Sequence, residues 1–525
     1  MQRRVVGALG AWIVLPGVVS VGCASRGALQ GVVTAAAPPE PAASAPLRVQ
    51  AGDRLAVLGV TDDGFALYWD AGAVYATELH PGAPRVKVVD AALPPLTLAV
   101  GRVALIWTAQ DPSAAPAVGP LVVWTHASGA KQASSASWPR LLFGIKASSA
   151  VSPDGREVLF VSNASADGKV GDIVRATSDL ASTTTLASGV LVSPSGACPP
   201  HVGFDVGRPG AAEPHHDASA VVLACPAGAQ PPVASLWRWT GDRREELSTN
   251  LAAGSWWGTD VRGDHLYARL RDLGSVVFDR RGAATVVEPL PSTGWINADG
   301  TLVLRVTTSE TTAELRRYTL GPTLHATKLR DLAVADRVHF PSALPGGFPY
   351  ANVSTLPTSP DGQFFLGYTR RSPDGFGNIE LVDLSGEAAR GVMLEEDTND
   401  YVYEQLATPD STRALYYKLD AARNATLFAA GRDGSKRQIS RGPTATETFG
   451  LHDAVVAFSD NLVGEGSSAF DTTDIRVADV GAERLAPATI ASGAYARFVP
   501  APGGRALVFS SLRGPLGPGL YLAPL

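Results

Sequence analysis

The sequence has no surplus of basic residues and no long block of like charge. Its 44 Lys and Arg stand against 50 Asp and Glu, giving a formal net charge of −6. That balance argues against a general nucleic-acid binder, which normally carries a basic surplus. Charged residues make up only 18% of the chain, against roughly 25% in typical soluble domains, and the absence of charge blocks excludes disorder over most of its length.

Sequence motifs for several kinds of chemistry are also missing. There is no Gly-x-Ser-x-Gly nucleophile elbow, no alternating strand–helix block that would form a hydrolase domain, and no Gly-rich phosphate loop. His215, His216 and Asp217, with His201 and Cys198 nearby, match no standard zinc spacing, so an exposed loop is the expectation there. The acidic run 395–400 lacks the glycine spacing of a calcium loop and predicts a solvated connection. We expect no metal and no cofactor.

Turn residues are abundant, and they recur in a pattern. Gly and Pro together account for 93 residues. Several nine-residue segments share one layout, in which a small or polar residue precedes a turn with Asp or Gly and then an apolar strand. Pro fixes φ at the first turn position, and Asp and Gly supply local hydrogen bonds and a permissive φ. The segments are SPDGREVLF from 152, SPDGQFFLG from 359 and TPDSTRALY from 408, with looser copies from 61, 297 and 501.

The spacing of these segments predicts the fold. Most lie one, two or three steps of about 46–49 residues apart, close to the roughly 40–50 residues of a four-stranded propeller blade. Helical periodicity is nearly absent, so we expect an all-β chain over residues 47–525: a β-propeller of four-stranded antiparallel blades, about 8–10 in one ring. The last unit is one strand short and Leu47–Gln50 is a spare strand, so the termini should close the ring. The alternative is two smaller propellers.

The segments resemble the TolB-like propeller repeat, in which a Ser-Pro-Asp-Gly turn and an apolar strand precede an Ile-Tyr-x-x-Asp-Leu type strand. The unit from 359 matches best and continues through NIELVDL at 378–384, and the unit from 152 continues with DIV at 172–174. The resemblance implies an interaction module of the bacterial cell envelope.

The N-terminus predicts export. Residues 1–22 form a signal peptide, with a basic MQRR start and a short uncharged stretch. The run SVGC at 20–23 resembles a bacterial lipobox, which implies lipidation of Cys23. Residues 24–46 are mostly Ala, Pro, Ser and Gly and should form a flexible tether behind that cysteine. Because Ala24 and Ser25 follow Cys23, the resemblance implies an outer-membrane lipoprotein facing the periplasm or the cell surface. An ordinary secreted protein and a retained anchor are the alternatives.

The two remaining cysteines suit an oxidising compartment. Cys198 precedes one strand-like segment and Cys225 follows the next. In an antiparallel pair the start of one strand lies beside the end of its neighbour, so we predict a Cys198–Cys225 disulfide, with two buried free thiols as the alternative.

The functional expectation is a non-catalytic propeller. Trp residues recur on or beside the strands, and we expect most of them to pack between blades rather than to form an exposed sugar or peptide platform. We expect a monomer that binds a protein, peptide or envelope polymer across one face, attached to the membrane only through its acyl anchor. The alternative is an enzyme, a propeller glycosidase or polysaccharide lyase with carboxylates at the channel mouth.

Overall fold

The computed structural model describes residues 45–525, apart from gaps of which the longest are 109–117, 138–149, 206–217 and 334–358. The predicted signal peptide, Cys23 and most of the tether lie outside the described residues. Residues 41–525 form one compact unit. Among the described elements of this unit, the regular structure consists of strands and one short 3-10 helix, η3 (Pro502–Gly504). In the same part of the chain no helix has the length and apolarity needed to span a membrane.

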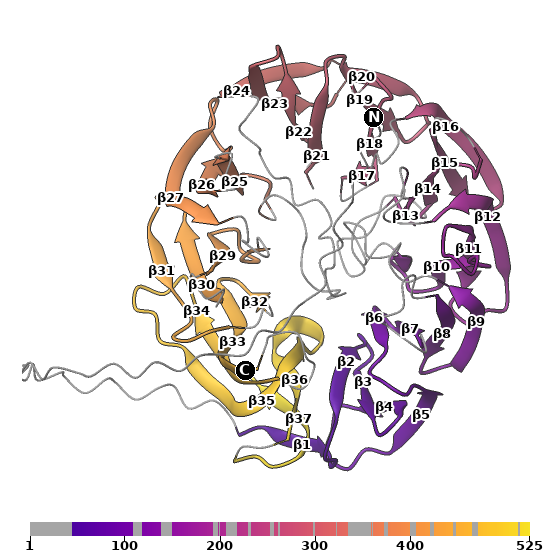
Figure 1. Cartoon of the computed structure of the whole chain (residues 1–525), viewed down its shortest axis with the longest axis vertical. Coiled ribbons are helices and arrows are strands. Elements are labelled where there is room, and N and C mark those ends of the chain that lie inside the picture. The colour runs from indigo at the N-terminus through magenta and orange to yellow at the C-terminus, as the bar shows by residue number, and fades with distance from the viewer. Residues whose placement is uncertain are drawn as a thin grey trace, which may run out of the picture. The chain divides into compact units, whose positions relative to one another are not determined.

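Consecutive strands pair antiparallel into small sheets, which are the blades of a propeller (Figure 1). Residues 103–107 pair with residues 121–125, for example, and residues 220–224 pair with residues 235–239. We number the blades along the chain. Blades 1 to 3 are built from β2 (Ala56–Val60), β3 (Phe65–Asp70), β4 (Ala73–Glu78) and β5 (Arg85–Asp90); β6 (Leu96–Val100), β7 (Val103–Trp107), β8 (Gly119–Thr125) and β9 (Gly129–Ser137); and β10 (Glu157–Ser162), β11 (Val170–Thr177) and β12 (Thr183–Leu191).

Blades 4 to 6 each have four strands. They are built from β13 (His201–Phe204), β14 (Ala220–Ala224), β15 (Ala234–Thr240) and β16 (Arg243–Leu251); β17 (Gly258–Thr259), β18 (His265–Arg269), β19 (Ser275–Asp279) and β20 (Ala284–Glu288); and β21 (Ser292–Ile296), β22 (Leu302–Thr307), β23 (Thr312–Thr319) and β24 (His325–Ala333). Blades 7 and 8 follow. They are built from β25 (Phe364–Arg371), β26 (Phe376–Asp383) and β27 (Arg390–Asn399); and β28 (Leu406–Ala407), β29 (Arg413–Leu419), β30 (Ala425–Gly431) and β31 (Lys436–Gln438).

The last two blades share one long strand and take a strand from the start of the unit. They are built from β32 (Thr448–His452), β33 (Val455–Val463), β34 (Thr472–Asp479), β35 (Ala488–Pro500), β36 (Ala506–Ser511), β37 (Gly519–Pro524) and β1 (Leu47–Gln50). The first part of β35 pairs with β34 as the outermost strand of blade 9, and its end pairs with β36 as the innermost strand of blade 10.

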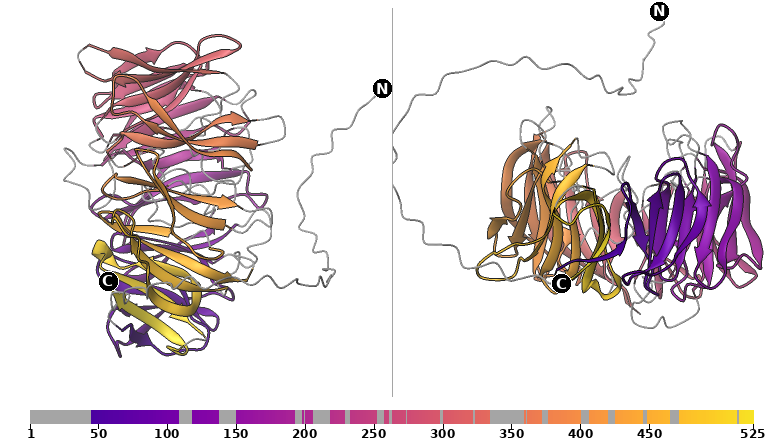
Figure 2. Two further views of the ribbon diagram at one scale, coloured as in Figure 1. Left: turned by 90° about the vertical axis from the view of Figure 1, so that its left-hand side faces the viewer. Right: turned by 90° about the horizontal axis from the view of Figure 1, so that it is seen from below.

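The ring is closed by its two ends. Strand β1 pairs antiparallel with β37, with Leu47 opposite Leu522 and Arg48 opposite Tyr521, and so becomes the outermost strand of blade 10 (Figure 1). Val49 on this strand is only 3% exposed and belongs to a core that joins blade 10 to blade 1. In Figure 2 the indigo strands of blade 1 accordingly lie next to the yellow strands of blade 10. The predicted closure by the N-terminal strand is confirmed.

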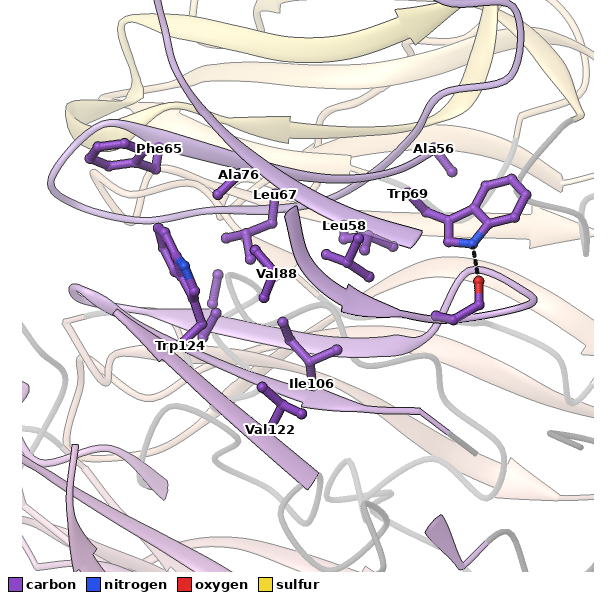
Figure 3. Close-up of a cluster of buried hydrophobic side chains, with 14 residues drawn as sticks. Ala56, Leu58, Phe65, Leu67, Trp69, Ala76, Val88, Ile106, Val122 and Trp124 are labelled. Carbon is purple, nitrogen blue, oxygen red and sulfur yellow. Dashed lines mark hydrogen bonds between the residues drawn. The ribbon is translucent and has the colours of Figure 1, made fainter. Parts of the chain in front are cut away.

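Hydrophobic cores lie between blades rather than inside them. The described residues form ten buried clusters between blades. Nine of them join blades that are consecutive in the chain, and the tenth joins blade 10 back to blade 1. The cluster between blades 1 and 2 contains Trp69 and Trp124, and the Trp69 indole donates a hydrogen bond of 2.7 Å to the Ala91 carbonyl (Figure 3). One ring of ten blades is thus the fold, and the alternative of two smaller propellers is excluded.

The outermost strands are irregular. In nine of the ten blades, counted over the described residues, the register between the two outermost strands shifts at a β-bulge or similar irregularity. The tenth outer strand, β31, has only three residues. A bulge inserts an extra residue into one strand and bends it.

The acidic run 395–400 departs from the prediction. Residues up to Asn399 belong to β27, the outer strand of blade 7, rather than to a solvated connection. Glu395 is 6% exposed, and its carboxylate accepts hydrogen bonds from Tyr416, Lys418 and Lys436 of blade 8. These partners lie 21 to 41 residues further along the chain, so a local charge pattern does not reveal them.

Candidate functional site

One face of the ring carries the repeated turns. Because the strands of a blade alternate in direction, the turn between its first and second strands lies at the same end as the hairpin between its third and fourth strands. We call this end of the ring the turn face. It is where the Ser-Pro-Asp-Gly segments of the sequence lie.

A buried polar residue marks the start of the turn in seven of the blades, within the described residues. Six of these side chains accept a hydrogen bond from an amide at or next to the start of the strand that follows the turn, and Asn297 instead donates to the Thr301 hydroxyl. A buried acceptor of this kind satisfies an amide that would otherwise lack a partner. The residues are Thr61, Ser152, Asp205, Asp260, Asn297, Ser359 and Thr408.

Basic side chains link neighbouring blades on this face. At five seams an Arg or Lys of one blade donates to main-chain carbonyls in the third-to-fourth strand hairpin of the next blade. Hydrogen bonds from a charged donor are stronger than neutral ones, so these contacts fix the blades against one another. The donors are Lys131, Arg175, Arg238, Arg317 and Arg437.

The seam between blades 7 and 8 is built differently. Here Arg432, in the β30–β31 hairpin of blade 8, reaches back to the turn of blade 7. Its guanidinium pairs with the Asp361 carboxylate, donates 2.9 Å to Gln363 Oε1, and lies 5.1 Å from the centre of the Phe364 ring. The same guanidinium donates 3.1 Å to the Ser411 carbonyl, so it joins the turns of both blades.

Ser411 occupies a backbone position that other blades give to glycine. Its φ is 60°, in the left-handed region that costs a non-glycine residue roughly 1 kcal/mol or more. The equivalent Gly155 and Gly362 both have φ of 70°. The serine hydroxyl accepts a 3.0 Å hydrogen bond from the Asp361 amide of blade 7, a contact that glycine lacks.

An open pocket lies beside this strained turn. It has a volume of about 490 Å³ and is lined by Asp410, Ser411, Thr412, Arg413, Arg432 and Asp433. We call it the Arg413 pocket. Its size falls within the usual range for ligand sites, roughly 300–1,000 Å³. Its lining places hydrogen-bond donors next to acceptors.

The carboxylates of the pocket are ionised and hold their own turns. Burial alone would raise the pKa of Asp410, but hydrogen bonds from Thr408 and Thr412 outweigh it and lower the pKa. The hydroxyl and amide of Ser435 both donate to Asp433 Oδ1 and lower the pKa of that carboxyl. In both residues Oδ1 accepts the hydrogen bonds of the turn. The two hydrogen bonds from Ser435 leave Oδ2 of Asp433 free to accept from other groups.

Arg413 is the least engaged cation of the pocket. Its Nε is buried without a hydrogen-bond partner, and its best contact is 3.5 Å from Nη1 to the Ser435 hydroxyl. Among the described residues no carboxylate oxygen comes within 4.0 Å of it. Arg175, Arg316, Arg330 and Arg432, by contrast, each have such a partner.

Both cysteines of the predicted disulfide lie among the described residues. A disulfide joins Cys198 to Cys225, with Cα atoms 6.1 Å apart, and both residues are fully buried between blades 4 and 5. A disulfide sulfur is not available as a thiolate ligand for zinc. Cys23, the predicted lipidation site, lies outside the described residues.

The candidate metal ligands do not come together in the part of the chain that the structure describes. His215, His216 and Asp217 lie outside it, and no group of three or more His, Cys, Asp and Glu side chains is close enough to hold a metal ion within it. Burial lowers the pKa of His201 to about 4, so its imidazole is neutral at pH 7.

The Trp prediction is confirmed for most of the described indoles. Within the described residues the more buried indoles are 2–8% exposed and pack in the cores between blades. They are Trp69, Trp107, Trp124, Trp237, Trp257 and Trp295.

Sequence reasoning did not single out Arg413 or Arg432. The only local signal near them is the turn at 408–411, where Ser411 replaces the expected glycine of the repeat. That substitution marks blade 8 as different, and the structure shows that the difference lies beside the pocket.

Comparison with known proteins adds little to this picture. No family model and no curated protein sequence matches the chain. Similar solved structures include a eukaryotic initiation factor (11% identity, covering 75% of this chain and 91% of that chain, TM-score 0.41). An oligogalacturonate lyase in complex with manganese (12%, 58% and 86%, TM-score 0.29) and TolB from Acinetobacter baumannii (10%, 71% and 80%, TM-score 0.28) are also similar. At such values the fold assignment rests on the sheets and cores described above.

Proposed function

We propose that this chain is an exported, lipid-anchored, non-catalytic β-propeller that binds a protein, peptide or envelope polymer on its turn face. The observation that carries the proposal is the Arg413 pocket. It lies on a face held rigid by contacts between blades, and it offers a guanidinium beside two ionised carboxylates. Donors and acceptors side by side suit recognition of polar polymers.

Export is supported by the disulfide and by the N-terminal sequence. Disulfides persist in oxidising compartments and are rare in the cytosol, and Cys198–Cys225 is buried in a core. The basic start, the uncharged stretch and the lipobox-like SVGC supply a route for export and acylation at Cys23.

The alternative glycosidase or lyase activity needs carboxylates available for acid–base chemistry. On the described part of the turn face, the turn carboxylates Asp154, Asp361 and Asp410 each accept hydrogen bonds within their own turn. We therefore assign none of them a catalytic role.

Site-specific photocrosslinking tests the proposal. A photoreactive amino acid replaces exposed Thr412 on the turn face of the full-length protein in its native cells. The matched control replaces Val463, which is 70% exposed and ends the second strand of blade 9, at the opposite face. We expect a discrete crosslinked adduct from position 412 and none from position 463. No adduct at either position, or an adduct only at 463, contradicts binding on the turn face.

A further inference from the structure

Arg413 is a cation on the turn face whose hydrogen-bond donors are not all satisfied. It lines the pocket and is half-buried. Its Nε has no hydrogen-bond partner, and the one side-chain hydrogen bond that the guanidinium makes among the described residues is the 3.5 Å contact from Nη1 to Ser435. An unsatisfied buried donor costs free energy, so its presence in a native structure needs an explanation, and an acceptor supplied by a ligand is one. For a guanidinium the matching acceptor is a carboxylate or a phosphate, which it binds through two parallel hydrogen bonds.

The backbone is shaped to hold this guanidinium. Gly431 lies directly against it, and a Cβ at that position would overlap Arg413 Nη1. The neighbouring Arg432 is already satisfied by Asp361, Gln363 and the Ser411 carbonyl. Arg432 is therefore held by three partners, whereas Arg413 feels the charge of Asp433 but makes no ion pair within 4.0 Å among the described residues.

The flanking charges select among anions. Asp410 and Asp433 line the pocket in ionised form. Hydrogen bonds within their own turns hold their pKa values below the usual range, and the Arg413 charge further lowers the pKa of Asp433. A phosphate dianion would meet more repulsion from these carboxylates than a monoanion. The same carboxylates accept N–H donors, which a peptide supplies next to its own carboxylate.

We propose that the Arg413 pocket recognises a carboxylate of a partner peptide or protein, bound through the Arg413 guanidinium, with neighbouring peptide N–H groups directed to Asp410 or Asp433. This inference rests on the proposed binding function and names the chemistry of the ligand. The carboxylate belongs either to a C-terminus or to an Asp or Glu side chain.

Arginine-selective labelling of the folded, full-length protein tests the first part. Phenylglyoxal labels accessible guanidinium groups, and peptide mapping measures labelling at Arg413 and Arg432 in one sample. We expect Arg432 to react about tenfold more slowly, because its charge-assisted hydrogen bonds must break first. An excess of N-acetylglycine, which has only a C-terminal carboxylate, or of N-acetylglutamate α-amide, which has only a side-chain carboxylate, should slow labelling of Arg413. The one that protects better identifies the source.

Two controls make the labelling decisive. N-acetylglycinamide, which is neutral, should give no protection, and inorganic phosphate should protect less than the carboxylates. Equal labelling of the two arginines, protection by the neutral amide, or stronger protection by phosphate overturns the inference.

The partner itself supplies a second test. In an Arg413→Gln background, crosslinking from position 412 should fall about tenfold, as expected for the loss of a charge-assisted pair. The matched control is Arg156→Gln in blade 3, since the Arg156 side chain is 84% exposed and lies on the same face. Undiminished crosslinking in a normally melting Arg413→Gln protein overturns the carboxylate proposal while leaving the binding function intact. If position 412 gives no adduct even when Arg413 is intact, the proposed binding function itself is contradicted.

Discussion

Closure of the ring by β1 should be measurable with a single side chain. Val49 is 3% exposed in the core between blades 10 and 1, whereas Leu47, two residues earlier on the same strand, is 45% exposed. Truncating a buried valine to alanine removes two methyl groups, which at about 0.8 kcal/mol each is worth about 1.5–2 kcal/mol. Leu47→Ala should cost well under 1 kcal/mol, because its side chain already faces solvent.

The change in melting temperature follows from the size of the unit. At about 2.1 cal/mol/K per residue, cooperative unfolding of roughly 480 residues has an entropy of about 1 kcal/mol/K, so Val49→Ala should lower Tm by about 2 °C. Deleting residues 24–44 should leave Tm nearly unchanged. Deletion through Gln50 also removes the Gln50 side-chain contacts with Thr77 and Ala83, and should cost several kcal/mol or cause aggregation.

Thermal melting followed by circular dichroism compares the variants. The reasoning is refuted if Val49→Ala and Leu47→Ala melt together, or if the truncations ending before and after β1 have equal stability. Either result would mean that β1 contributes no more than the tether does.

Three other predictions concern the anchor, the disulfide and the half-buried His201. Cys23→Ala should move the protein from membrane to soluble fractions, because an acyl chain is the only anchor that the sequence predicts; unchanged fractionation would contradict acylation. The Cys198→Ala/Cys225→Ala double variant should lose on the order of 3 kcal/mol, since the bridge closes a loop of 27 positions. Two thiols alkylated without prior reduction would count against the bridge. The pKa of His201 falls from 6.5 unfolded to about 4 folded, so the unfolded chain binds more protons in that range and stability should drop as pH falls through it. His201→Gln should flatten this part of a urea-midpoint profile against pH, and an unchanged slope would contradict the assignment.

The features that could be predicted from sequence are those made by local contacts. The turns at Ser152, Ser359 and Thr408 depend on hydrogen bonds within six residues, so similar residue types recur wherever this turn forms. Their period of about 49 residues is enough to give ten blades. The turns at Asp205 and Asp260 escaped detection, because a carboxylate replaces the hydroxyl and no Pro-Asp-Gly follows it.

The Arg413 pocket could not be predicted in the same way. It depends on Arg432 reaching Asp361, 71 residues earlier in the chain, and thereby leaving Arg413 without an ion pair among the described residues. Glu395 illustrates the same limit, since its cationic partners come from two other strands. A local sequence pattern identifies a charged residue. Whether that residue has an ion-pair partner depends on which strands and blades lie beside it in the fold.

The irregular outer strands have a consequence for how copies of this protein meet. A ring of ten blades presents ten sheet edges at its rim, and a regular exposed edge is a template on which another chain can add a strand. Register shifts in nine of these edges, over the described residues, break the even spacing of amide and carbonyl groups that such addition requires, and the tenth is only three residues long. If acylation concentrates the rings on a membrane surface, their rims will touch often. The bulges should then keep those encounters from growing into continuous intermolecular sheets.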